Sequence, residues 1–262
     1  WKKFVSGVRA KLLHRYSLKS TYKPDEVIKA VDAAMASTDD DAMVKFNNGP
    51  AASDDANFYG PRRNNLATYR QTDLIIRYMD GSVYTSIRDP RMPFLFKPPT
   101  DGTFRGLRMN EGEATSLPNA RKTSNFWGAY TLTAPAGGVD TDARSFFKNN
   151  APFPVMTYSE LQFIKAEAAF IKGDKATALA AYQKGIKGCF EMYKKYYTGY
   201  TAFTDKQADD FITAVSPKAA ADLTLSDIMI QKFVALWGYG FEETWVDLRR
   251  YKYSPDIYKT FA

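Results

Sequence analysis

The sequence predicts a mainly α-helical protein, in which a superhelix of TPR-like (tetratricopeptide-like) helix hairpins carries long irregular loop insertions. Apolar residues recur at helical spacing in residues 1–36 and 155–262, whereas Gly, Pro, Asn and Asp punctuate residues 37–154. Small residues, mostly Ala, recur along the helices expected after residue 155, which lets paired helices approach closely. We therefore expect one domain over 1–262, with a helical scaffold, a loop-rich region and helix hairpins in that order.

The first predicted helix begins at the first residue. Its apolar stripe consists of Trp1, Phe4, Val5, Val8 and Leu12. Because no capping residue precedes this stripe, we expect the sequence to be part of a longer chain. A second helix is predicted to begin at Pro24, whose fixed φ suits a first helical turn and which two acidic residues follow.

The loop-rich region contains two segments with their own periodicity. Residues 68–79 are predicted to form a short helix, and residues 81–87 alternate enough to predict a short strand or extended segment. Long loops inside a compact domain are usually functional or poorly ordered, so this region is the first place to look for a binding site.

Helical order is predicted to return at Thr157. Thr157 and Glu160 have the spacing of a capping box, and the apolar stripe that follows ends at Gly173. A partner helix carries apolar residues from Leu179 to Tyr193, so the two segments predict an antiparallel hairpin of the TPR kind.

Two more helices are predicted near the end of the sequence. One begins at Thr224, which has Asp227 at capping-box spacing. The other begins near Glu242 and is limited by Pro255.

Composition excludes several classes of protein. The 36 Lys and Arg exceed the 29 Asp and Glu by seven, but basic residues occur singly or in pairs among carboxylates, which indicates a solvated surface and no nucleic-acid partner. The single Cys189 and the single His14 cannot build a zinc site, so we expect no metal and no cofactor. We expect Cys189 to be a small buried residue and His14 to be a surface or helix-capping residue with no partner that the sequence identifies.

Paired carboxylates would be needed for a glycosidase, which is the enzymatic alternative. The acidic runs are Asp39–Asp41, Asp54–Asp55 and Glu242–Glu243. Adjacent ionised carboxylates repel one another and remain hydrated, so we interpret these runs as solvated surface. The sequence therefore favours a protein that is not an enzyme.

Several blocks of residues then occur in a recognisable order. They are Trp1-Lys2-Lys3-Phe4 through Leu12, Asp89-Pro90-Arg91-Met92-Pro93, Met156–Leu161 with Ala166-Glu167-Ala168-Ala169, Gly185-Ile186, and finally Gln231-Lys232-Phe233 with Glu243, Trp245, Asp247 and Arg249-Arg250. In this order they resemble the SusD/RagB family of outer-membrane nutrient-binding lipoproteins.

The resemblance implies a lipoprotein exposed on the cell surface, in the outer membrane of a Gram-negative bacterium. It implies that the protein captures oligosaccharide and delivers it to a SusC-like TonB-dependent transporter. The membrane would be reached through an N-terminal lipid anchor that is absent from this sequence. A peptide-binding member of the same family, and a helical scaffold that binds only a protein partner, are the alternatives.

The residues that match the family best are expected to be structural. They are Glu160, Glu167, Glu243, Trp245, Asp247, Arg249 and Arg250. All of them fall on predicted helices, so we expect Trp245 to pack at a helix-core position and the charged groups to tie the hairpins together through charge-assisted hydrogen bonds.

The candidate ligand site lies in the loop-rich, ligand-facing region 37–154. Its residues are Tyr59, Arg62, Asn125, Phe126, Trp127 and Tyr130. A sugar offers an apolar C–H face and a ring of hydroxyls, so a site for it combines flat aromatic side chains with Asn or Arg at their edge. Alternatively, the same aromatic residues attach the loops to the helical core.

Overall fold

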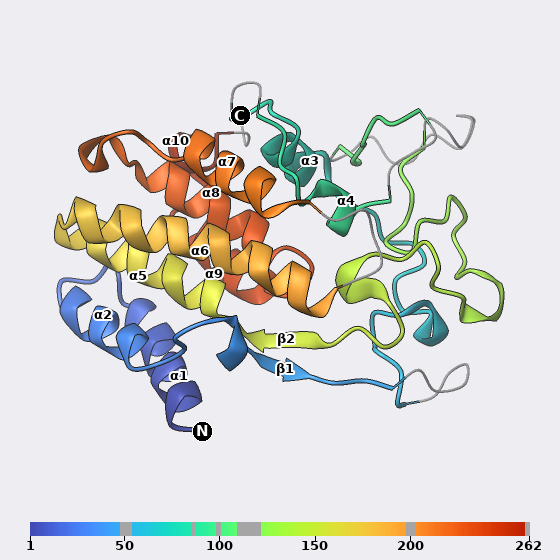
Figure 1. Ribbon diagram of the computed structural model, residues 1–262, viewed down its shortest axis with the longest axis horizontal. Helices are drawn as coiled ribbons and strands as arrows, with labels where there is room; N and C mark the ends of the chain where they lie inside the picture. Colours follow the sequence, from blue (N-terminus) through green and yellow to red (C-terminus); the bar gives the residue numbers. More distant parts are fainter. Residues whose placement is uncertain (48–53, 85–86, 98–100, 109–121, 198–202, 260–262) are drawn as a thin grey trace. The chain divides into compact units, whose positions relative to one another are not determined.

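The computed structural model describes the chain except for six short segments, 48–53, 85–86, 98–100, 109–121, 198–202 and 260–262 (Figure 1). The chain divides into two compact units. Unit 1 consists of Trp1–Met43, Pro154–Met192 and Asp205–Ala262, and unit 2 consists of Val44–Phe153 and Tyr193–Thr204. The single domain expected over 1–262 stays a prediction.

The first two helices of unit 1 begin where the sequence predicts them. Helix α1 (Lys2–His14) and helix α2 (Pro24–Asp32) lie side by side (Figure 1). They pack on helix α5 (Tyr158–Lys172) through a core that includes Ala10, Val27, Val31, Leu161 and Ile164. Burial of these apolar side chains supplies the main stabilising free energy of this corner of the unit.

The predicted helix hairpin is present. Helix α5 ends at Gly173, whose φ of +88° starts the turn into helix α6 (Lys175–Tyr196). The two helices are held closely, because the Ser159 hydroxyl donates to the Gly185 carbonyl at 2.7 Å. A Cβ at Gly185 would lie only 2.9 Å from the Phe163 ring, so a glycine is required there.

The expected capping box at Thr157 forms only in part. The Thr157 hydroxyl accepts a hydrogen bond from the Glu160 backbone N–H at 3.1 Å, as predicted. The Glu160 carboxylate, however, is buried and lies 2.7 Å from the Lys11 ammonium group. A full opposite charge is a stronger partner for a buried carboxylate than a backbone N–H, which explains the difference.

The last part of unit 1 contains four α-helices among its described residues. They are α7 (Asp205–Val215), α8 (Leu225–Leu236), α9 (Phe241–Arg250) and α10 (Pro255–Tyr258). The predicted capping box is complete on α8, since Thr224 and Asp227 bond each other's backbone N–H at 3.1 and 3.0 Å. Helix α7 was not predicted, although Ala208, Phe211 and Val215 form its buried face.

A two-stranded sheet was also missed. Strand β1 (Ala42–Val44) pairs with strand β2 (Phe153–Met156). Strands of three and four residues are too short to show a convincing alternation, and Pro154 argues against a strand in the sequence.

Unit 2 has little regular structure. Its helices among the described residues are short, namely α3 (Asp73–Met79), α4 (Met92–Leu95) and the 3₁₀ turns Pro61–Arg63, Ala136–Gly138 and Ser145–Phe147. Aromatic side chains fill its interior, where Phe94, Phe146, Tyr193, Tyr197 and Phe203 contact one another. A buried ion pair in which Arg91 donates to Asp89 at 3.0 and 2.5 Å fixes the turn before α4.

Two local predictions in unit 2 need correction. The helix predicted over 68–79 begins only at Asp73, because Arg70 forms a β-bridge with Asn125 and its guanidinium donates to four carbonyls. The strand predicted over 81–87 is wrong for Gly81–Tyr84, which form turns, and residues 85–86 lie outside the described residues. The φ of +99° at Gly81 does not fit an extended strand.

Among the described residues, no helix combines the length and the apolar character required to cross a lipid bilayer.

Candidate functional site

Aromatic rings of unit 2 stack where the sequence predicts a ligand site. The Phe126 ring lies parallel to the Phe147 ring, with centroids 4.6 Å apart, and the Tyr59 ring stacks on Phe147 at 6.0 Å. Phe153 meets Tyr59 edge-on at 5.0 Å. Phe147 is buried, whereas Tyr59 and Phe126 are half-buried. The rings of two half-buried residues are thus held in place by stacking on a third ring that is buried.

Trp127 and Asn125 lie inside unit 2. Trp127 is only 1% exposed, and its indole N–H donates to the Tyr59 carbonyl at 2.7 Å. The Asn125 side-chain oxygen accepts from the backbone N–H groups of Trp127 and Ala129 at 3.0 and 2.9 Å. These two side chains therefore shape the loop that presents Phe126, and neither offers a surface to solvent.

The remaining two predicted residues are half-buried at the surface of unit 2. The Arg62 backbone N–H donates to the Asn149 side chain at 3.0 Å, and the Asn149 amide group donates to the Gly138 carbonyl at 2.9 Å. Tyr130 lies within electrostatic range of Arg105. The Arg105 guanidinium donates to Asp101 and lowers the pKa of that carboxyl to about 2.

Two exposed rings of unit 2 were not among the predicted site residues. Phe58 is exposed, contacts Tyr59 at 5.9 Å between centroids, and has its carbonyl bonded by the Asn65 side chain at 3.0 Å. Tyr69 is exposed beside the bridge between Arg70 and Asn125. In the sequence, Phe58 and Tyr69 could have been found as aromatic residues next to turn-forming residues. The ligand role of the six predicted residues stays a prediction.

A second polar cluster is buried in unit 1 and centres on Glu167. Its carboxylate accepts from the Tyr251 hydroxyl at 2.5 Å and from Arg250 at 3.0 Å, and it lies 2.9 Å from His14 Nε2. Burial by itself would raise the pKa of Glu167, but the charges of His14 and Arg250 and their contacts hold it well below its ordinary value. Glu167 is therefore a buried carboxylate that its neighbours keep ionised.

Further ion pairs extend this buried cluster across four helices. Lys11 lies 2.7 Å from Glu160 and 3.3 Å from Glu243. On the other side, Asp247 lies 2.7 Å from both Lys232 and Arg250. Helices α1, α5, α8 and α9 are thereby tied together, which confirms the predicted structural role of Glu160, Glu167, Glu243, Asp247 and Arg250 but not that of the exposed Arg249.

Two expectations about this region are wrong. His14 is buried and lies 2.8 Å from the Tyr22 hydroxyl on its other side, because helix α1 packs against the helix that carries Glu167. Trp245 is 53% exposed and does not belong to the core. The Arg249 guanidinium lies 4.6 Å above its ring, a cation–π contact at the surface.

The cavity beside the buried cluster is too small for an organic ligand. It measures about 10 Å³ and is lined by Lys11, His14, Arg15, Ile164, Lys232, Glu243, Val246, Asp247 and Arg250. Such a volume accommodates roughly one water molecule. Within the described parts of the chain, no group of three or more His, Cys, Asp or Glu side chains is placed to hold a metal ion.

The charges around Glu167 predict that unit 1 loses stability in acid. Because the folded-state pKa of Glu167 lies below its ordinary value of 4.5, its ionisation stabilises the fold above pH 4.5, and this contribution is lost as pH falls through the folded pKa. The pKa of Glu243 is lowered as well, because the charges of Lys11 and Arg15 together outweigh the effect of its burial. Its ionisation therefore also stabilises the fold, and this contribution is likewise lost in acid. Burial raises the pKa of Glu160, so the contribution of this group to the free energy of unfolding changes with pH in the opposite direction.

We expect urea denaturation to show a free energy of unfolding that falls steadily between pH 5 and pH 3. In a Glu167→Gln variant this dependence should be clearly weaker. An unchanged pH dependence in the variant would show that Glu167 does not carry it.

Comparison with known proteins decides the family. The model of the SusD-like family, described as starch-binding and associating with the outer membrane, matches residues 1–260. The chain belongs to the SusD-like family. No curated protein sequence matches it.

Solved structures of SusD-like proteins share the fold. A SusD homologue from Bacteroides fragilis superposes with a TM-score of 0.68 at 17% identity, over 100% of this chain and 58% of its own. A SusD/RagB family protein from Bacteroides thetaiotaomicron has a TM-score of 0.56 at 24% identity, over 96% of this chain and 53% of its own. A protein named as chitin-binding has a TM-score of 0.56 at 19% identity, over 95% of this chain and 51% of its own.

These likenesses confirm the predicted mainly α, TPR-like fold of the SusD-like chain. The chain spans little more than half the length of the solved relatives it matches. The family is described as starch-binding, which at the level of the family supports the prediction of a binding protein that is not an enzyme.

Proposed function

We propose that this SusD-like protein binds oligosaccharide on the cell surface and delivers it, chemically unchanged, to a SusC-like TonB-dependent transporter. Membership of a family described as starch-binding and associating with the outer membrane supports the ligand class and the location. The name of the chitin-binding relative supports a glycan in the same way. Attachment to a Gram-negative outer membrane through an N-terminal lipid anchor is part of the proposal.

The observation that carries the proposal is the pair of surface rings supported by Phe147. Tyr59 and Phe126 stack on this buried ring at 6.0 and 4.6 Å, so neither has to be ordered when a ligand arrives. A ring that is already fixed loses little conformational entropy on binding, which favours a weak ligand such as a sugar.

Two polar residues that lie close to these rings in the sequence, Arg62 and Tyr130, complete the proposed site. Arg62 and Tyr130 are half-buried, and the exposed Phe58 next to Tyr59 enlarges the aromatic surface. The rings would pack on the C–H faces of sugar units while the guanidinium and phenol groups bond hydroxyls. Trp127 and Asn125 serve the same site from below, by holding the loop that carries Phe126.

Calorimetric titration with starch-derived and chitin-derived oligosaccharides tests this function. We expect dissociation constants between about 1 µM and 1 mM, which correspond to roughly −8 to −4 kcal/mol. A response to peptides but to no glycan would favour the peptide-binding alternative. Release of reducing sugar would contradict the assignment as a binding protein.

Substitution of Phe126 by Ala should weaken glycan binding by about tenfold or more, since one stacked ring contributes about 1.4 kcal/mol or more. The matched control is Tyr16→Ala, which removes an exposed ring from unit 1. We expect this control to bind like the parent protein. Equal affinity of Phe126→Ala and the parent protein would exclude the proposed aromatic surface.

A further inference from the structure

Two buried asparagines lie between the segments that carry the stacked rings of unit 2. Asn57 is 1% exposed and Asn149 is 2% exposed. Asn57 precedes Tyr59 by two residues, and Asn149 follows Phe147 by two residues. The backbone N–H of Asn57 donates to the Asn149 carbonyl at 2.7 Å, so the two segments are joined at the asparagines.

The Asn57 side chain forms hydrogen bonds with both segments. Its NH₂ group donates to the carbonyls of Phe146 and Lys148, which flank Phe147, at 2.6 and 3.0 Å. Its oxygen accepts from the Tyr59 backbone N–H at 3.1 Å. Both amide hydrogens and the oxygen are therefore used, and one side chain fixes the backbone that carries the Tyr59 ring and the backbone that carries the Phe147 ring.

The Asn149 side chain holds the segment that follows Tyr59. Its oxygen accepts from the Arg62 backbone N–H at 3.0 Å, and its NH₂ group donates to the Gly138 carbonyl at 2.9 Å. A Cβ at Gly60 would lie only 2.8 Å from the Asn149 Cα, so this close approach requires a glycine. Asn149 thereby fixes the backbone from which the Arg62 guanidinium extends.

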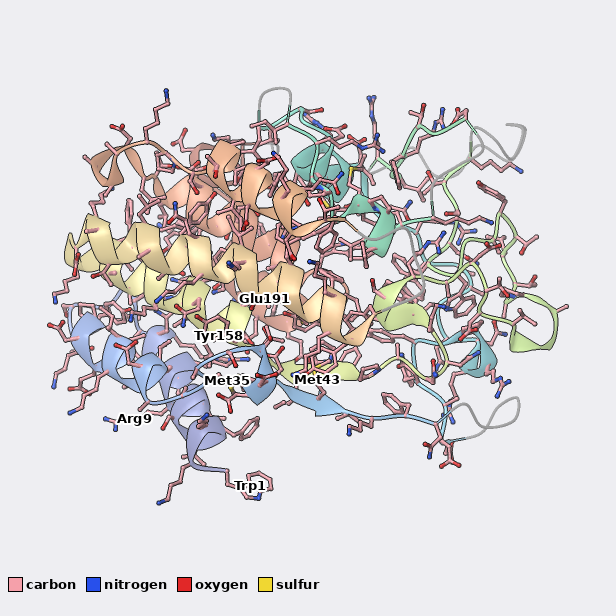
Figure 2. The ribbon with its side chains drawn as sticks, viewed as in Figure 1. Trp1, Arg9, Met35, Met43, Tyr158 and Glu191 are labelled. Carbon is pink, nitrogen blue, oxygen red and sulfur yellow. The ribbon has the colours of Figure 1, made fainter. Side chains whose placement is uncertain are left out.

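These hydrogen bonds supply a direction that ring stacking lacks. The segments around both asparagines consist of turns, and Figure 2 shows side chains between the loops of unit 2. Aromatic rings attract one another over a wide range of centroid separations, whereas a hydrogen bond weakens steeply as its angle changes. A buried amide whose partners are all present adds little net stability but selects one arrangement. Amides are thus better suited than stacking to set where a ring lies.

We propose that Asn57 and Asn149 are positioning residues of the proposed glycan site, in which Asn57 places the Tyr59 ring against Phe147 and Asn149 places Arg62. This inference rests on the proposed function, because Tyr59 and Arg62 are the groups that would contact the sugar. The asparagines themselves are buried and bonded within the protein, so they act through these two residues. Loss of either amide lowers the affinity for glycan, because the ring or the guanidinium must then be ordered on binding.

The first test needs no ligand and uses Asn57→Ser. Ser keeps an oxygen for the Tyr59 N–H but is too short to reach the carbonyls beside Phe147. In the parent protein we expect the NMR signals of the Tyr59 ring, assigned by their absence in Tyr59→Leu, to be shifted by the ring current of Phe147. In Asn57→Ser this shift should largely disappear while the protein stays folded. An unchanged shift in the variant would overturn the proposal.

The second test measures coupling in glycan binding. The probe is the starch-derived or chitin-derived oligosaccharide that binds the parent protein most tightly. We expect Asn57→Ser to weaken its binding about fivefold or more and Tyr59→Leu about tenfold or more, but the double variant to bind like Tyr59→Leu alone. A residue that acts only through Tyr59 has nothing left to position once that ring is absent. Asn149→Ala and Arg62→Ala should show the same coupling, which provides the test if Asn57→Ser does not fold.

The matched control is Gln71→Ala, which removes another buried amide of unit 2. The Gln71 NH₂ group donates to the Arg105 carbonyl at 2.8 Å, and its loss should leave the Tyr59 ring shift and the glycan affinity unchanged. The proposal is overturned if this control acts like Asn57→Ser, or if the effects of the single variants multiply in the double variant. Failure of the parent protein to bind any oligosaccharide contradicts the proposed function instead, and the ring shift then still decides whether Asn57 positions Tyr59.

Discussion

Substitution of Glu167 by Gln should lower the free energy of unfolding by about 3–5 kcal/mol, the range observed when one partner of a buried ion pair is removed. Glu167 is fully buried and accepts bonds from Arg250 and Tyr251. The Gln side chain fits the same space but carries no charge, so the Arg250 guanidinium remains buried with less compensation. Because a natural domain is stable by only about 5–15 kcal/mol, this loss should be visible as a large fall in the melting temperature.

The matched control for this prediction is Glu243→Gln, which makes the same chemical change in the same cluster. The Glu243 side chain is partly exposed, and its partner Lys11 keeps a second carboxylate, Glu160, at 2.7 Å. We expect the control to cost about 1 kcal/mol or less, as for pairs that water screens. Similar losses in both variants, measured by urea denaturation, would show that burial of Glu167 does not set the size of the effect.

The parts of the fold that could be predicted from the sequence are those specified by residues close together in the chain. The Thr224 and Asp227 capping box and the Gly173 turn are each specified by residues a few positions apart, and the structure contains both. Strand β1 was missed because its cause is not local, since its three residues are extended only through pairing with β2. Helix α7 was missed although Phe211 and Val215 show helical spacing.

The candidate sites were harder to predict because their contacts join distant segments. From the sequence alone His14 is expected at the surface. The packing of α1 against the helix that carries Glu167 is what buries it. In the same way, the composition around Trp127 predicts an aromatic loop but does not show which ring is covered. The direction of each ring depends on the Tyr59 carbonyl and on Phe147, which are remote in the sequence. Residue type therefore predicted the segment, while only the packing separates supporting rings from exposed ones.

Trp127→Ala should destabilise unit 2 by about 3–5 kcal/mol, the usual cost of deleting a buried large aromatic side chain. The indole is 1% exposed and its N–H bonds the Tyr59 carbonyl, so the substitution removes both packing and a hydrogen bond. We expect hydrogen exchange to accelerate around Tyr59 and Phe126, and glycan binding to be lost together with this protection.

The variant Trp127→Phe tests whether Trp127 supports the loop that carries Phe126 or contacts the sugar directly. The Phe ring keeps most of the packing and loses the indole N–H, so we expect a loss of about 1–2 kcal/mol and a glycan affinity close to that of the parent protein. If Trp127 were itself a stacking surface for sugar, Trp127→Ala would abolish glycan binding without changing the unfolding free energy. Stability and affinity should therefore fall together in Trp127→Ala, whereas Phe126→Ala should lose affinity at a smaller cost to the fold, because Phe126 is half-buried.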